Sequence, residues 1–157
     1  MYRNPKKGIT EVTSYVLLTL LIVVISTIVF LFSQGYLEQV RADASYESME
    51  NQLKQVGVLF EKNSHFDRSG FSYYFSFEEG ALLLEDNEIK YISLKSYEGE
   101  EECVSLLCYR SEGGAEVIAF ELPAGFSFSE EANIMPGSYT MYFELDKNEG
   151  EYDFYLR

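Results

Sequence analysis

The feature that most constrains this chain is a long apolar run near its start. Residues 12–36 contain no charged side chain and are rich in Val, Ile and Leu. About 20 apolar residues, each rising 1.5 Å, suffice to cross a hydrocarbon core roughly 30 Å thick. Inside lipid every backbone N–H and C=O must be paired internally, and an isolated segment achieves that only as a helix. The run therefore predicts a transmembrane helix over residues 9–35.

Charge is divided unevenly around this helix. Arg3, Lys6 and Lys7 precede it, and Glu11 is the one acidic residue before Tyr36, so 25 acidic and 9 basic residues follow. Basic flanks tend to stay in the cytoplasm, which predicts a single-pass protein of the cell membrane with an extracellular C-terminal region. The acidic excess argues against a nucleic-acid partner, because binding phosphates requires Lys and Arg.

The start of the chain carries a recognisable signal. Lys6-Lys7-Gly8, then Ile9-Thr10-Glu11 and the apolar helix, resembles the class III signal of type IV pilins and archaellins, especially archaeal pilin-like proteins. The resemblance implies that residues 1–8 are a leader, recognised through Lys6 and Lys7 by a prepilin peptidase that cuts between Gly8 and Ile9. It implies other pilin-like subunits as partners and covers about the first 35 to 60 residues.

Glu11 departs from the family pattern. Bacterial pilins and many archaeal ones place a Glu at the fifth mature position, whereas here Glu11 is the third and Thr13 the fifth. The resemblance assigns Glu11 the role of pairing with the new α-amine of a neighbouring subunit during assembly.

Beyond the membrane the helical pattern continues as an amphipathic stretch over residues 36–62. Apolar residues recur there mostly every three or four positions, with charged residues between them: Leu37, Val40, Ala44, Met49, Leu53, Val56 and Phe60. Such a stripe usually packs on a core. Residues 63–70, NSHFDRSG, are polar and rich in turn formers, which predicts a hinge.

The period then changes from helical to alternating. Residues 71–77, 139–145 and 152–156 alternate apolar and polar positions, and turn residues recur every 8 to 12 positions. Residues 71–77, 81–85 and 89–94 are expected to form a three-stranded meander. The prediction is an α+β fold: a long N-terminal helix, transmembrane in one half and amphipathic in the other, packed on an extracellular antiparallel β-sheet or β-sandwich head, residues 71–157.

Two cysteines lie in this head. If residues 101–110 form one extended strand, Cys103 and Cys108 lie roughly 16 Å apart at ~3.3 Å per residue, too far for a disulfide. The intervening VSLL lacks turn residues, so the spacing favours two buried thiols. A disulfide between them is the alternative and requires a turn inside VSLL.

Catalytic and metal motifs are sparse. One histidine, His65, cannot supply the repeated imidazoles of common zinc sites, and no nucleophile elbow or phosphate loop is present, so the chain is not expected to be an enzyme. Asp146, Asn148 and Asp153 in DKNEGEYD resemble a short calcium loop, the one cofactor considered, although the glycine and bidentate Glu of an EF-hand are misplaced. A hairpin turn is the simpler interpretation.

Two functions follow from these features. The first is a structural subunit, major or minor, of a cell-surface filament or a related secretion or adhesion apparatus, processed after Gly8. The second is an unprocessed, membrane-anchored surface protein whose β head binds a ligand or partner. Processing and release by shear distinguish them.

Overall fold

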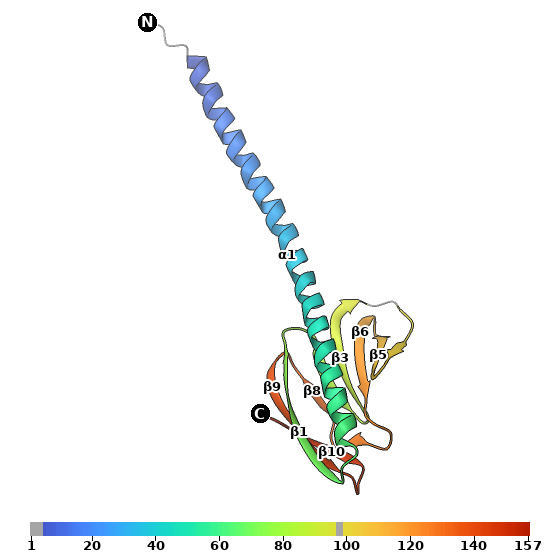
Figure 1. Cartoon of the computed structure of the whole chain (residues 1–157). Coiled ribbons are helices and arrows are strands. Elements are labelled where there is room, and N and C mark those ends of the chain that lie inside the picture. The colour runs from blue at the N-terminus through green and yellow to red at the C-terminus, as the bar shows by residue number, and fades with distance from the viewer. Residues whose placement is uncertain (1–4, 97–98) are drawn as a thin grey trace. The chain divides into compact units, whose positions relative to one another are not determined.

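The computed structural model confirms an α+β fold, with one long helix followed by ten strands (Figure 1). It describes residues 5–96 and 99–157, with side chains described from residue 12. The chain divides into two compact units, Met1–Val40 and Arg41–Arg157, which we treat separately.

Helix α1 spans Pro5–Asn63 and contributes to both units. It begins at Pro5, four residues before the expected start, since proline's fixed φ suits the first turn of a helix. At its C-terminal end, Ser64 N–H donates to the Phe60 carbonyl at 2.9 Å, and the Asn63 side chain donates to the Leu59 carbonyl at 2.8 Å. These bonds pair carbonyls that the last turn would otherwise leave free.

Four strands form the first sheet, which we call sheet A. Its order is β1-β9-β10-β7, with bounds β1 Arg68–Phe77, β9 Gly137–Asp146, β10 Glu151–Leu156 and β7 Ser127–Phe128. β1 and β9 pair over ten residues, from Arg68 opposite Asp146 to Phe77 opposite Gly137. β7 pairs with β10 in parallel, so the head is not wholly antiparallel as expected.

Six strands form the second sheet, sheet B. Its order is β4-β5-β6-β3-β2-β8, with bounds β4 Glu102–Val104, β5 Leu107–Glu112, β6 Ala115–Glu121, β3 Glu88–Ser96, β2 Ala81–Glu85 and β8 Ala132–Ile134. A two-residue glycine turn joins β5 to β6, and Gly113 and Gly114 both have positive φ in it, as such hairpin turns require.

The core lies where the second half of α1 meets both sheets. Met49, Leu53, Val56 and Phe60 recur every three or four residues on one face of the helix and are fully buried. Phe60 contacts aromatic rings of sheet A and of β6 in sheet B. The predicted packing of the amphipathic stretch on the head is therefore confirmed.

A glutamine on this part of α1 covers an edge of sheet A. Gln52 accepts from the Ser76 N–H at 3.0 Å and donates to the Ser76 carbonyl at 2.9 Å. The side-chain amide thus occupies the place of a neighbouring strand on β1, which has a strand on one side only. Covered edges of this kind resist pairing with other chains.

The hinge boundary and the pairing of the first three strands differ from expectation. The predicted hinge over residues 63–70 is shorter, because residues 68–70 already pair with β9. The predicted meander is wrong: β1 belongs to sheet A, whereas β2 and β3 pair in sheet B. Alternation identifies which face of a strand is buried and carries no information on its partner, which for β1 lies far along the chain.

Candidate functional site

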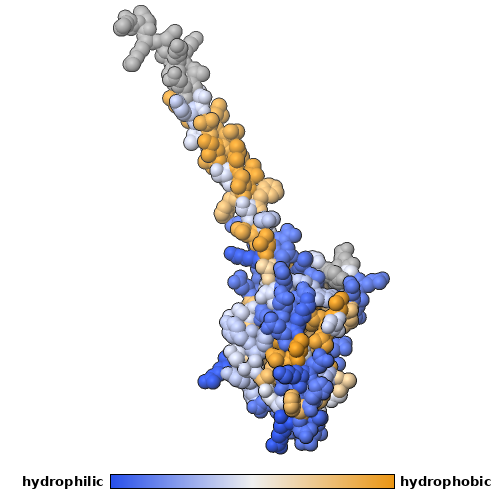
Figure 2. Space-filling view, viewed as in Figure 1, coloured by the Kyte–Doolittle hydropathy of each residue, from blue (hydrophilic) through white to orange (hydrophobic). Residues whose placement is uncertain are grey.

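The apolar segment of α1, residues 12–40, presents its side chains to the exterior. Every described side chain from Val12 to Val40 is exposed, and most are large and apolar (Figure 2). Helix α1 contains the one candidate membrane span among the described residues, long and apolar enough to cross a bilayer. An apolar surface of this size normally contacts lipid or other protein.

Three hydroxyl side chains of this segment bond within the helix. The Thr27 hydroxyl donates to the Val23 carbonyl at 2.8 Å, and Ser33 donates to the Val29 carbonyl at the same distance. Thr19 makes the equivalent bond to Tyr15. Since these hydroxyls find acceptors one turn earlier, they do not require water, which makes the segment compatible with lipid.

The predicted processing and assembly residues are at the start of this helix. Lys6, Lys7, Gly8, Ile9 and Glu11 all fall within α1, but their side chains lie outside the described residues. The roles of these residues in processing and assembly stay predictions from the sequence.

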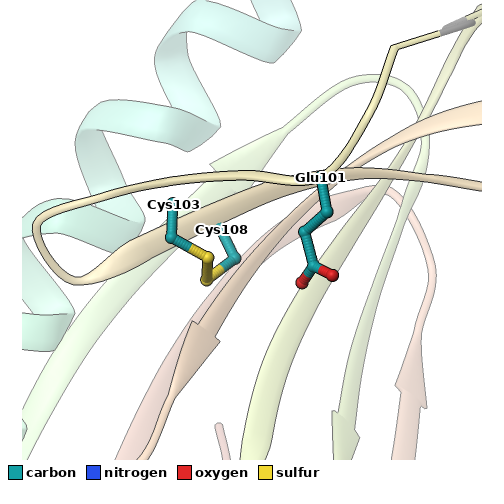
Figure 3. A group of neighbouring side chains, drawn as sticks. All are labelled: Glu101, Cys103 and Cys108. Atoms are coloured by element: carbon teal, nitrogen blue, oxygen red, sulfur yellow. A yellow bond between two sulfur atoms is a disulfide. The ribbon is translucent and has the colours of Figure 1, made fainter.

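The two cysteines correct the sequence prediction. Cys103 on β4 lies directly opposite Cys108 on β5, with 4.0 Å between their Cα atoms, and a disulfide joins them (Figure 3). Two buried thiols and a single strand over residues 101–110 were both wrong. A two-residue turn at Ser105 and Leu106 reverses the chain, with Ser105 at φ 61°.

This turn forms without glycine because its surroundings support it. A left-handed conformation costs a residue like serine roughly 1–2 kcal/mol. The turn brings Leu106 against α1 at Gly57, where an added Cβ would lie 3.3 Å from a Leu106 methyl carbon and 2.8 Å from the Phe120 ring. Gly57 thus permits close approach of hairpin and helix, and contact with the helix together with the disulfide holds a turn that local propensity does not predict.

We expect this disulfide to stabilise the head measurably. Replacing both cysteines by serine should lower the free energy of unfolding by about 2 kcal/mol, the loop-entropy value for so short a loop. Urea unfolding of the two proteins measures the difference. In the unmodified protein, alkylation should add mass at Cys103 and Cys108 only after reduction; labelling without reductant would contradict the disulfide.

The one group of three potential metal-ligating His, Cys, Asp or Glu side chains among the described residues contains this disulfide. It consists of Glu101, Cys103 and Cys108 (Figure 3). Metal-binding cysteines coordinate as thiolates, and these two sulfurs are bonded to each other, so the group does not suit a metal in this state.

The predicted calcium residues form a hairpin turn. One carboxylate oxygen of Asp146 accepts the backbone N–H of Asn148 at 3.0 Å, and Gly150, at φ 74°, donates to the Asp146 carbonyl. Asp153 lies on β10 opposite Glu144. Asp146 and Asp153 line one depression on sheet A, Asn148 is not among its lining residues, and a calcium site here stays a prediction.

Paired polar groups join helix α1 to sheet B. Glu50 of α1 accepts from the Tyr109 hydroxyl at 2.8 Å and pairs with Lys54. Burial and this bond raise the pKa of Tyr109 to about 12, and the bonds from Lys54 and Tyr109 hold the pKa of Glu50 below its usual value. These groups join helix to sheet B and leave no free acid or base.

A charged network also crosses the outer face of sheet B, and sequence reasoning did not single it out. Lys90 pairs with Glu85 at 2.6 Å and Glu88 at 2.9 Å, while Arg110 pairs with Glu88 and Glu112. Burial alone would raise the pKa of Glu88, but hydrogen bonds from Lys90 and Arg110 outweigh it and lower that pKa.

This network predicts a pH dependence of stability. Because the pKa of Glu88 is lower in the folded state, its contribution is fully present above the ordinary carboxyl pKa of 4.5 and is lost as pH falls through the folded value. The melting temperature of Glu88→Gln should therefore lie below that of the unmodified protein at neutral pH, and the gap should narrow in acid. Thermal melts from pH 7 to pH 3 measure it, and a constant gap would contradict the assignment. Acid also changes the overall charge repulsion within the protein. Because this change affects both proteins, it cancels in the difference between their melting temperatures.

The chain matches no known protein-family model, no curated protein and no solved structure.

Proposed function

We propose that this protein is a pilin-like structural subunit of a cell-surface filament or related apparatus. In this proposal a prepilin peptidase removes residues 1–8, the apolar segment of α1 packs first in the membrane and then with other subunits, and the acidic head faces outside. The class III signal resemblance of Lys6 to Glu11 motivates the proposal.

The observation that carries it is the contrast within one helix. From Val12 to Val40 apolar side chains are exposed, whereas from Met49 to Phe60 the apolar stripe of the same helix is buried. Burying a large apolar side chain is worth about 1.5–3 kcal/mol, so the exposed segment has a strong tendency to associate with lipid or with copies of itself. A subunit that passes from bilayer to filament uses both associations.

The second candidate, an unprocessed membrane anchor with a binding head, predicts the same helix and the same lipid contact. Processing after Gly8 and association between subunits separate the two. Glu11 belongs to the first candidate, in which it pairs with the α-amine that cleavage exposes on a neighbouring subunit.

Shearing cells of the source organism tests the proposal. The filament hypothesis expects the chain in the sheared, sedimentable extracellular fraction, assembled with itself or with other subunits. An integral membrane protein with a single helix serves as the matched control and should stay with the cells. Recovery of this chain wholly in the membrane fraction would favour the anchor.

A further inference from the structure

The outer face of sheet A carries three tyrosines that the core does not use. Tyr74, Tyr142 and Tyr155 are 60%, 38% and 53% exposed. Tyr142 lies directly opposite Tyr155 across β9 and β10, and Tyr74 lies opposite Thr140, two residues from Tyr142. Directly paired side chains lie about 5 Å apart at Cβ and diagonal neighbours within about 8 Å, so the three tyrosines are neighbours on one face, which we call the aromatic surface.

These tyrosines differ from those at the helix contact. Tyr73, Tyr91 and Tyr109 each donate their hydroxyl to a protein acceptor. Within the described residues, the hydroxyls of Tyr74, Tyr142 and Tyr155 have no such partner. The outer rings therefore combine exposed apolar faces with free hydroxyl groups.

A groove adjoins this aromatic surface between β1 and β9. One depression is lined by Ser72, Tyr142 and Glu144 and a second, of about 450 Å³, by Arg68, Asp146 and Asp153, and the two share Gly70 and Glu144. Gly70 has no side chain to fill the space opposite Glu144. The second depression lies in the size range of small-molecule sites.

Charged groups of both signs line the groove, and of these Asp146 accepts the Asn148 N–H. Among the described residues no ion pair or hydrogen bond joins the Arg68 guanidinium, although Asp146 lies opposite it. Glu144 and Asp153 face each other across β9 and β10, and like charges in that position are destabilising. The groove thus offers free donors at Arg68 and the tyrosines, and free acceptors at Glu144 and Asp153.

We propose that this face of sheet A, comprising Tyr74, Tyr142, Tyr155 and the groove at Gly70, binds a neutral oligosaccharide. The C–H faces of pyranose rings stack on exposed aromatic rings, and each sugar hydroxyl both donates and accepts hydrogen bonds. A neutral polyol matches this surface better than an anion, which the carboxylates of Glu144, Asp146 and Asp153 would repel. A basic peptide would match the carboxylates but would meet Arg68. The inference concerns the head alone and holds for either candidate function.

Saccharide binding is measured on the full chain in lipid nanodiscs, which avoids detergents with sugar headgroups. The probes are cellotetraose, mannotetraose and chitotetraose, and their binding is detected by saturation-transfer NMR and quantified by titration. We expect at least one to bind, and the Tyr142→Ala, Tyr155→Ala double variant to bind it at least about tenfold more weakly, as expected for losing two ring contacts. Phe66→Ala removes an equally exposed aromatic ring outside this face and should leave binding unchanged.

Other outcomes would overturn the proposal. They are the absence of binding by all three tetrasaccharides, binding that the double variant leaves intact, and binding of octalysine in their place. Thermal melts verify that the double variant folds, and Glu144→Gln provides a further variant, which should weaken saccharide binding only a few-fold. Because the readout is saccharide affinity, failure here is distinguishable from failure of the filament proposal, which concerns assembly.

Discussion

Introducing two arginines into the apolar segment, Leu21→Arg with Ile25→Arg, is expected to prevent stable membrane insertion. Each arginine near the centre of a spanning helix costs about 3 kcal/mol on insertion scales, so the pair costs roughly 6 kcal/mol. Both positions are more than half exposed in the structure, so in a membrane the new charges would face lipid. The protein should move from the membrane fraction, resistant to alkaline extraction, to the soluble or degraded fraction.

A matched variant on the same helix controls for added charge. Glu47→Arg with Asn51→Arg places two arginines at the same spacing, at exposed positions beyond the apolar segment. This variant should remain in the membrane. Equal membrane retention of both double variants would contradict a spanning role for residues 12–36.

Replacing Phe60 by alanine should produce the largest loss of stability in the head. The Phe60 ring is fully buried and lies between 4.8 and 6.0 Å, centroid to centroid, from the rings of Phe71, Phe120, Phe128, Phe143 and Tyr152. These partners come from both sheets, so the cavity would open where helix and sheets meet. Phe→Ala changes in such sites cost about 3–5 kcal/mol, a large part of a typical domain's 5–15 kcal/mol.

This loss is measured by urea unfolding of the full chain in nanodiscs, with the near-UV circular dichroism of the tyrosines as the signal. Phe66→Ala is again the matched control, because its ring is 55% exposed and should change stability by less than about 0.5 kcal/mol. A loss below about 1 kcal/mol for Phe60→Ala would mean that the helix is not the centre of the core.

The parts of the fold that rest on local patterns were predictable from the sequence. Local sequence patterns determine three of its features. The helical period gives the stripe from Met49 to Phe60, apolar–polar alternation gives β9 and β10, and the backbone preference of glycine gives the turn at Gly113. The pairing of β1 with β9 was not predictable, because it depends on which strands share the core. The Cys103–Cys108 turn was missed because contacts with the helix and the disulfide override the low turn propensity of VSLL.

The candidate sites were predictable to a smaller extent. The apolar segment follows from composition alone. The outer face of sheet A could have been found in part, because Tyr74, Tyr142 and Tyr155 occupy strand positions between the core residues. That they meet on three adjacent strands, beside a groove with an unpaired Arg68, depends on strand order.

The central claim, that this chain is a processed, assembling subunit, is tested most directly by the intact mass of the protein isolated from its native membrane. The account predicts a chain that begins at Ile9, lacking residues 1–8 and retaining the whole of the apolar segment. A chain that still begins at Met1 would contradict it and leave the unprocessed membrane anchor.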